Sequence, residues 1–288
     1  MSIRMPVAAG QFYEGTEQGL KSQIEECFTH KIGAGKLHEV NPEGERKILG
    51  LISPHAGYIY SGPVASHGFY RLAQDGIPAN VIILGPNHQG MGKMIAISTQ
   101  DSWQTPLGNI KINKDLANKI IAGCDFIDFD EKAHIYEHSL EVQVPFLQYL
   151  YKDKFKIVPI CMMDQSLESA TGVGKAITKA ITNEDVVIIA STDFTHYESG
   201  ESAKRKDKLA LDHILKIDSE GLLETIEESE ISMCGPGPVS VLLTVAKELG
   251  TKETILLKYA NSGDVSGDYG AVVGYASVIT EKGTGYFI

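Results

Sequence analysis

Three hydrophobic segments of the chain share one pattern, in which a run of apolar residues is followed at once by a short polar loop. The runs are 48–52, 81–84 and 186–190, and they are rich in β-branched residues. Such runs are typical of strands that are buried on both faces of a parallel sheet. Because open α/β sheets place their ligands at the carboxyl ends of the strands, we expect the three following loops to share one site.

Between these runs the spacing of apolar residues alternates between helical and strand-like. Helices are predicted at 16–28, 63–73, 114–122, 134–151, 167–182, 203–217, 221–228 and 238–249. Further strands are predicted at 94–98, 109–112, 155–161, 255–260 and 271–279, with a hairpin-like excursion at 103–108. Pro63 is expected at the first position of its helix, and Pro145 is expected to kink the helix over 134–151.

The order of these elements predicts a single α/β domain over residues 1–288. Its central sheet should be mostly parallel or mixed, with helices on both faces. Residues 1–15 are expected to lie extended on the domain, and 31–47 to form a surface loop. The chain shows no internal repeat and no change of composition that would mark a linker.

Composition and charge narrow the class of protein. The net charge is −11 and the pI is near 5.3, with the acidic residues spread along the chain. Nucleic acid and membrane surfaces are therefore not expected as partners, since both require basic patches. The sequence has neither a long apolar run nor the apolar core of a signal peptide, and its four cysteines form no CxxC pair. A cytoplasmic protein is the expectation.

Two histidines occupy equivalent positions after the first two strands. His55 follows Ser53-Pro54, and His88 follows Gly85-Pro86-Asn87. Neutral imidazoles on rigid loops suit either a metal ion or a general base, although a single such histidine often only bonds a loop carbonyl. The repeated placement favours a functional role for both.

The third loop and a cysteine add further candidates. Asp193 and His196 follow the strand at 186–190 and could form an acid–base pair or outer metal ligands, or Asp193 could cap a helix. Cys234 precedes a predicted helix, whose amino end would favour the thiolate that attacks electrophiles or binds metal. The other reading of Cys234 is a small buried hydrophobe, which is our reading of Cys27, Cys124 and Cys161.

A different constellation lies at residues 134–138, where His134, Glu137 and His138 match the HxxEH pattern of inverted zinc proteases. On a helix the two histidines would stand one turn apart and could grip zinc, with Glu137 activating water. The alternative is that His138 and Glu141 face the shared loop cluster from the side or form a helix-capping network.

Several blocks of the sequence, taken together and in order, resemble the Memo family. They are RMPVAAGQFYEG, SPHAGYIYSGPVA, ILGPNHQG, WQTPLG, EHSLEVQVPFLQYL, STDFTHYE, ISMCGPGP and YANSGDVSGD. Prokaryotic members of this family are known as protein B of the AmmeMemoRadiSam system, and their fold is similar to that of LigB-like class III extradiol dioxygenases. The resemblance covers essentially the whole chain.

The resemblance implies a metal site formed by His55, His88 and Cys234, with Asp193 and His196 beside it. Two imidazoles and a thiolate suit iron or copper better than magnesium or calcium. It also implies radical-SAM and AMMECR-type proteins of the same system as partners. Because LigB-like enzymes use a carboxylate where this family has a cysteine, ring cleavage does not follow from the fold.

The leading hypothesis is a non-haem, iron- or copper-dependent redox enzyme that acts on a small substrate. In it Asp193, His196 and His138 act as catalytic groups that position water or move protons, with His138 just outside the metal's ligands. The alternatives are a non-catalytic protein that binds a small molecule, a peptide or a metal in the same cleft, and the HxxEH zinc protease.

Overall fold

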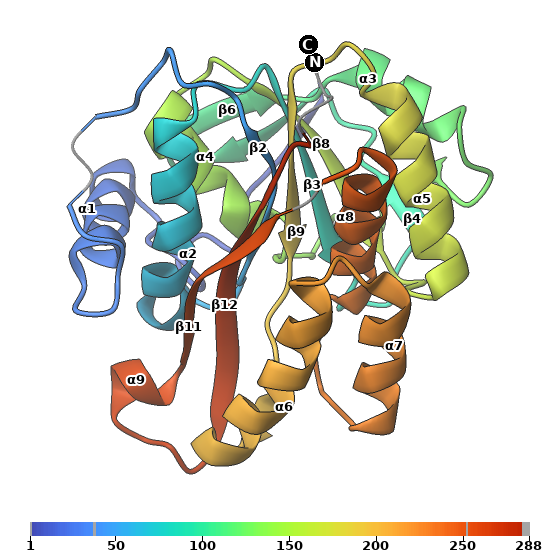
Figure 1. Cartoon of the computed structure of the whole chain (residues 1–288). Coiled ribbons are helices and arrows are strands. Elements are labelled where there is room, and N and C mark those ends of the chain that lie inside the picture. The colour runs from blue at the N-terminus through green and yellow to red at the C-terminus, as the bar shows by residue number, and fades with distance from the viewer. Residues whose placement is uncertain (1, 37–38, 252, 284–288) are drawn as a thin grey trace.

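A mixed sheet of nine strands forms the centre of the part of the chain that this computed structural model describes, residues 2–36, 39–251 and 253–283 (Figure 1). Four parallel strands make its middle, in the order β2 (Ile48–Ser53), β9 (Val186–Ser191), β3 (Asn80–Pro86) and β8 (Lys156–Met162). The edges are β4 (Ile95–Ile97) with β7 (Asp128–Phe129), and β12 (Val272–Glu281) with β10 (His196–Glu198) and β11 (Thr254–Asn261). Strand β12 runs antiparallel to β2, and β4 antiparallel to β8, so the predicted mixed sheet is confirmed.

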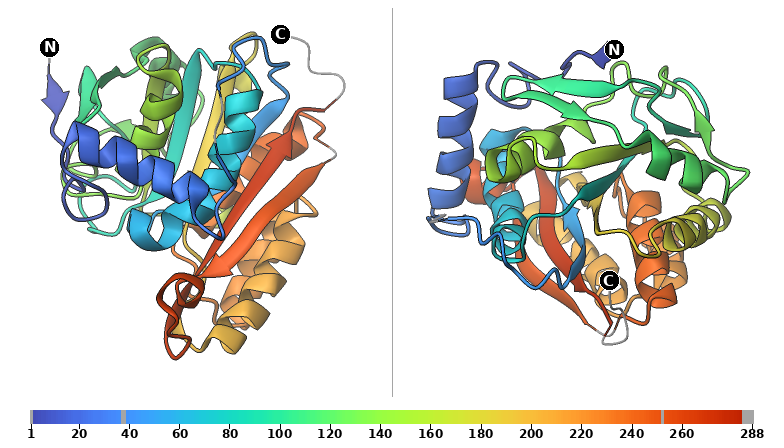
Figure 2. Two further views of the ribbon diagram at one scale, coloured as in Figure 1. Left: turned by 90° about the vertical axis from the view of Figure 1, so that its left-hand side faces the viewer. Right: turned by 90° about the horizontal axis from the view of Figure 1, so that it is seen from above.

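Helices cover both faces of this sheet, as Figure 2 shows. One layer contains α3 (Lys114–Ile121), α5 (Leu167–Ala180), α6 (Gly200–Ile214), α7 (Ser219–Glu228) and α8 (Pro236–Glu248). The other contains α1 (Glu17–Thr29), α2 (Tyr58–Gln74), the 3-10 turn η1 (Glu141–Gln143) and α4 (Val144–Tyr151). The short helix α9 (Gly263–Ser266) lies between β11 and β12 in sequence.

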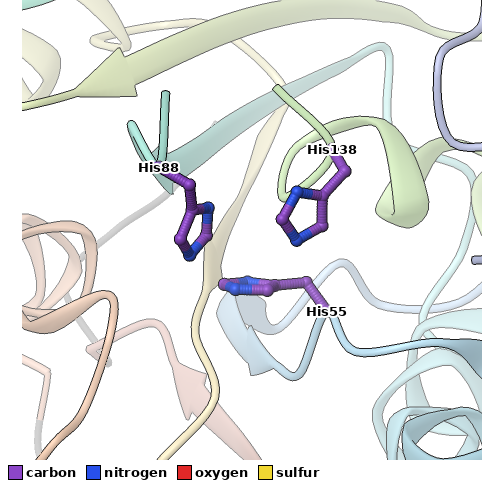
Figure 3. A group of neighbouring side chains, drawn as sticks. All are labelled: His55, His88 and His138. Atoms are coloured by element: carbon purple, nitrogen blue, oxygen red, sulfur yellow. The ribbon is translucent and has the colours of Figure 1, made fainter. Parts of the chain in front are cut away.

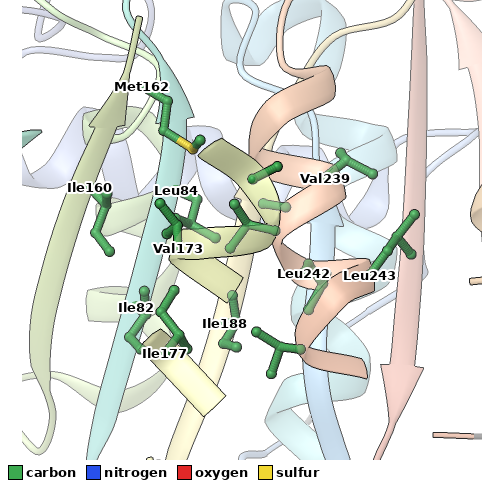
Figure 4. Close-up of a cluster of buried hydrophobic side chains, with 14 of the residues drawn as sticks. Ile82, Leu84, Ile160, Met162, Val173, Ile177, Ile188, Val239, Leu242 and Leu243 are labelled. Atoms are coloured by element: carbon green, nitrogen blue, oxygen red, sulfur yellow. The ribbon is translucent and has the colours of Figure 1, made fainter. Parts of the chain in front are cut away.

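The central strands are apolar throughout because each face packs against a different helical layer. Along β3, Ile82 and Leu84 join the core beneath α5 and α8, whereas Val81 and Ile83 join the core on the opposite face (Figure 4). This period-two alternation is the geometry of any strand. Helix α8 packs so closely on β2 that a Cβ atom at Gly50 would lie 2.3 Å from the Leu242 side chain.

The amino-terminal segment forms a second, smaller sheet. Strand β1 (Ile3–Arg4) pairs in parallel with β5 (Ser102–Thr105), which forms a hairpin with β6 (Gly108–Lys111). The Arg4 guanidinium lies over the Trp103 ring, 4.3 Å from its centroid. The predicted hairpin-like excursion is thus confirmed, whereas the amino-terminal segment is extended at β1 but turns at residues 8–13.

Two predictions about proline-containing helices are wrong. Helix α2 begins at Tyr58, so Pro63 lies inside it, where the missing N–H costs one intrahelical hydrogen bond. Residues 134–151 do not form one kinked helix, since a loop precedes η1 and helix α4 begins only at Val144. Pro145 lies in the first turn of α4, a position that proline tolerates.

The other predicted helices and strands are found to within a few residues at their ends, whereas the short elements β7, β10 and α9 were not predicted. Helix α2 connects β2 to β3, which run parallel but are not neighbours, because β9 lies between them. Among the described residues, no helix is both long and apolar enough to cross a membrane.

Candidate metal centre

The carboxyl ends of β2, β9 and β3 lie side by side at one edge of the sheet. Ser53 pairs with Ser191 across β2 and β9, and Leu84 pairs with Ala190 across β3 and β9. Because the strands are parallel, the loops that follow them open in the same direction. The expectation that these three loops meet is confirmed.

Three imidazoles converge at this edge, from His55 after β2, His88 after β3 and His138 in the loop before η1 (Figure 3). One ring nitrogen from each lies within 4.8 Å of the others. The ring centroid of His55 is 5.2 Å from that of His88 and 5.5 Å from that of His138. Neutral imidazoles at this spacing could hold a metal ion.

His55 is the most enclosed of the three, with 1% of its surface exposed. Its backbone amide donates to Asp193 Oδ1 at 2.8 Å, and its Nδ1 lies 2.9 Å from Ser191 Oγ. Burial, together with the neighbouring His88, lowers the pKa of His55 well below the usual histidine range. The ring is therefore neutral at physiological pH, as a metal ligand must be.

His88 is held by Glu137, although its own side chain is 31% exposed. The carboxylate lies 2.9 Å from His88 Nδ1 and accepts the His88 backbone amide at 2.6 Å and that of Ser139 at 2.9 Å. Burial by itself would raise the pKa of Glu137, but the hydrogen bond and charge of His88 bring it down to about 2. An ionised carboxylate behind a histidine orients that ring as a ligand.

His138 stacks on both sides. Its ring lies 4.8 Å from that of His88 and 4.2 Å from that of Phe12, with 24° between the planes in each pair. Burial and the neighbouring His55 lower the pKa of His138 to about 4. The sequence predicted His138 beside the metal rather than among the ring nitrogens that could hold it.

Cys234 lies against His55, with its Sγ atom 3.2 Å from His55 Nε2. The Asp193 amide donates to the same sulfur at 3.1 Å. Burial and the Asp193 carboxylate raise the pKa of the Cys234 thiol, so the thiolate predicted from the helix end is not favoured without a cation. Cys234 also stands before Gly235, the N-cap of α8.

Asp193 lies at the site, and His196 is close enough to influence the pKa values of both His55 and Asp193. Asp193 is buried beneath the loop that carries His55, and burial raises the pKa of its carboxyl group. His196 Nδ1 lies 2.8 Å from the carbonyl oxygen of Ser232, and His196 begins strand β10 instead of a helical turn. Asp193 therefore caps no helix, and the predicted helical turn shared with His196 is absent.

The HxxEH pattern does not form the geometry of a zinc protease. His134 and His138 lie in a loop, and His134 Nε2 is 3.1 Å from the Ala96 carbonyl oxygen. The buried His134 ring packs edge-on against Trp103, with centroids 5.6 Å apart. The His134 ring therefore contacts Ala96 and Trp103 and is not one of the three converging imidazoles.

The sequence patterns did not identify some of the residues that shape the site. Phe12, Gln143 and Ser191 reach it through contacts between distant segments. Only Ser191 left a signal, because it is the polar residue that ends an apolar strand. Cys27, Cys124 and Cys161 are buried free thiols, as predicted.

The sequence of this chain is similar to those of known proteins along nearly its whole length. The family described as Memo-like protein matches residues 4–279. A MEMO1 family protein of Methanopyrus kandleri is 46% identical over 282 residues, which is 97% of this chain and 99% of the relative. One from Sulfurisphaera tokodaii is 48% identical over 280 residues, 96% of this chain and 98% of the relative.

A solved structure supports the fold. The crystal structure of an uncharacterized protein from Escherichia coli K12 matches with a TM-score of 0.52 at 12% identity, covering 81% of this chain and all of that one. At this identity the likeness concerns the fold alone. The match along nearly the whole sequence, together with relatives of almost equal length, shows that this chain belongs to the Memo family.

Proposed function

We propose that this chain is a metal-dependent redox protein that holds iron or copper at its sheet edge and acts on a small substrate. The observation that carries the proposal is the convergence of His55, His88 and His138, with the Cys234 thiol 3.2 Å from His55. Nitrogen and sulfur donors suit these transition metals better than magnesium or calcium. When bound, such an ion would supply one-electron chemistry that the side chains themselves lack.

The chain's own residues fit this use. Ser191 and Glu137 occupy the Nδ1 atoms of His55 and His88, which leaves an Nε2 atom on each ring. We propose Cys234 as the third ligand, as the family resemblance implies, with His138 beside it. Asp193, whose pKa is raised by burial, would hold or pass a proton, and His196 would assist at the rim.

Metal content tests the ligand assignment. Protein purified without affinity metals would be loaded anaerobically with iron(II) or copper(I) and analysed for metal. We expect about one ion per chain, lost in the double variant His55→Ala, His88→Ala. The double variant His30→Ala, His67→Ala removes two histidines that are not part of the cluster and should bind normally. Undiminished metal in the first variant would refute the assignment.

Single variants separate the two possible third ligands. If Cys234 binds the ion, Cys234→Ser should weaken binding more than His138→Gln, and in protein loaded instead with copper(II) the thiolate-to-copper(II) absorption band should disappear. The opposite order would make His138 the ligand. Oxygen consumption by the loaded protein with candidate phenols then tests for catalysis.

The second candidate function is a binding protein that uses the same cleft without turnover. Three exposed tyrosines lie within a few residues of His55, His138 or His196: Tyr60, Tyr136 and Tyr197 are 42%, 59% and 79% exposed. Exposed aromatic side chains of this kind are enriched where proteins bind ligands or peptides. Metal binding without oxygen consumption across the phenols would favour this function.

A further inference from the structure

We propose that Ser191 fixes His55 in the tautomer that carries its proton on Nδ1, so that the Nε2 lone pair is presented to the site. Ser191 is the last residue of β9, and its side chain is buried beneath the His55 loop. It is a positioning residue that acts through His55. The part of this inference that concerns metal affinity rests on the proposed function, whereas the tautomer itself does not.

The hydroxyl of Ser191 has one proton, and that proton is already used. Ser191 Oγ lies 2.7 Å from the carbonyl oxygen of Ser139. A carbonyl oxygen only accepts hydrogen bonds, so Ser191 must be the donor in this contact. Every other contact of Ser191 Oγ has to be one in which the oxygen accepts.

Gln143 supplies one of those contacts. Its side-chain Nε2 lies 2.8 Å from Ser191 Oγ and 2.9 Å from the carbonyl oxygen of Pro54. Since the Pro54 carbonyl can only accept, the amide group must present its nitrogen here, which fixes the orientation of Gln143. Gln143 therefore donates to both oxygens.

The remaining contact of the hydroxyl is with His55. Nδ1 lies 2.9 Å from Ser191 Oγ, whose proton is committed to Ser139. His55 Nδ1 must then carry the hydrogen, because in the other tautomer two lone pairs would face each other. Ser191, Gln143 and His55 are each at most 1% exposed, so solvent water has little access to relieve such a conflict.

The consequence is an Nε2 atom without a proton, directed at the site. This is the atom that lies 3.2 Å from Cys234 Sγ. Outer hydrogen bonds of this kind fix the tautomer of metal-binding histidines. Here a single short segment supplies the fixing groups for two rings, because Glu137 holds His88 while Ser139 and Gln143 hold Ser191.

Nitrogen NMR of the metal-free protein tests the tautomer directly. With ¹⁵N-labelled histidine at neutral pH, the His55 signals are identified by their loss in His55→Ala. We expect Nδ1 to show the shift of a protonated nitrogen and Nε2 that of an unprotonated one. In Ser191→Ala the Nε2–H form should appear, and Ser191→Thr, which keeps a hydroxyl group, should restore the original pattern.

The structure offers a closely matched control in Ser53. It is paired with Ser191 across β2 and β9, is equally buried, and its hydroxyl has no hydrogen-bond partner among the described residues. Ser53→Ala therefore removes the same group from the same edge and should leave the His55 tautomer unchanged. A wild-type protein with its proton on Nε2, or an unchanged tautomer in Ser191→Ala, would overturn the inference.

Metal affinity separates this inference from the proposed function. Ser191→Ala should weaken iron(II) or copper(I) binding about 10–100-fold, whereas Ser53→Ala should not. An unchanged affinity beside an altered tautomer would overturn the link to the metal. If no variant binds metal, including the wild type, the proposed function fails while the expected tautomer pattern still upholds the role of Ser191.

Discussion

The ring of Phe12 stacks on the ring of His138, with centroids 4.2 Å apart and 24° between the planes. These residues lie far apart in the sequence, so the stack joins the amino-terminal segment to the cluster of His55, His88 and His138. The same segment is tied to α2, because the Tyr58 amide donates to the Phe12 carbonyl oxygen at 2.8 Å. The amino-terminal segment therefore forms part of the wall of the site.

Replacing Phe12 should loosen His138 without unfolding the protein. We expect Phe12→Ala to lose about 0.5–1.5 kcal/mol of stability beyond the burial term, since this is the usual size of a stacked pair. Metal affinity should fall by no more than about tenfold, the equivalent of about 1.4 kcal/mol. Thermal unfolding and a metal titration would measure both. Phe12→Leu keeps an apolar side chain without the stack, and stability and metal affinity equal to those of the wild type in this variant would contradict a role for stacking.

Glu141 holds the same amino-terminal segment through hydrogen bonds. Its carboxylate accepts Arg4 Nη1 at 2.6 Å, Tyr13 OH at 2.6 Å and the amides of Val7 and Ala8 at 2.9 Å each. Both members of the Arg4–Glu141 ion pair are buried, with side chains 3% and 1% exposed. Removing one charge of such a pair strands the other in a poorly solvated place.

We therefore expect Glu141→Gln to lower the free energy of unfolding by about 3–5 kcal/mol, as measured by urea denaturation. Glu17→Gln, which breaks the exposed pair with Lys21, should leave it essentially unchanged. A loss below about 1 kcal/mol in Glu141→Gln would show that the segment is held mainly by other contacts.

The sequence predicted what depends on local pattern and missed what depends on distant partners. The three apolar strands and their polar loops are local features, and so the sheet and the positions of His55 and His88 followed from them. The predicted helix over 134–151 failed because Arg4 reaches across the chain. It donates to the carbonyl oxygens of His134 and Glu137, at 2.8 and 2.7 Å, which a helix would have used internally.

Contacts between distant segments also explain the position of His138. Because residues 134–138 form a loop and not a helix, the His138 ring can lie beside His55 and His88. No spacing within residues 134–138 encodes this arrangement. The environment of the Cys234 thiol also depends on distant partners. Burial and the Asp193 carboxylate raise its pKa in the absence of a cation, and no local pattern around residue 234 encodes that contact.

A pH-dependent contribution is expected where α6 meets α7. Asp218 caps α7 by accepting the Gly221 amide, and its other oxygen lies 2.8 Å from His213 Nδ1. The hydrogen bond from His213, with that from Gly221, lowers the pKa of Asp218. A carboxyl group whose pKa is lower in the folded state stabilises the protein above its unfolded pKa, about 3.9 for aspartate, and this stabilisation is lost as the pH falls through the folded value.

Asp218→Asn keeps a capping side chain and removes only the charge. Because the Asp218 side chain is 44% exposed, we expect a cost below about 1 kcal/mol at pH 7 that shrinks toward zero in acid. Urea unfolding across the pH range would measure it. Asp268→Asn, in an exposed turn, reports the general effect of removing one negative charge, and a parallel pH course in the two variants would refute a specific role for His213.

The sharpest prediction for the site concerns Glu137, because the carboxylate has three N–H groups to accept and a glutamine can match only part of them. His88 N and Nδ1 and Ser139 N all point at its two oxygens. In Glu137→Gln the amide nitrogen must replace one oxygen and face a donor, so the His88 ring should turn or lose its fixed tautomer. We expect iron(II) or copper(I) binding to weaken about 10–100-fold. Glu131→Gln, which alters the carboxylate that Ser98 contacts away from the cluster, should bind normally. Full metal affinity in both Glu137→Gln and Glu131→Gln would contradict this role of Glu137, because either His88 would bind without the carboxylate or the other side chains of the cluster would hold the ion.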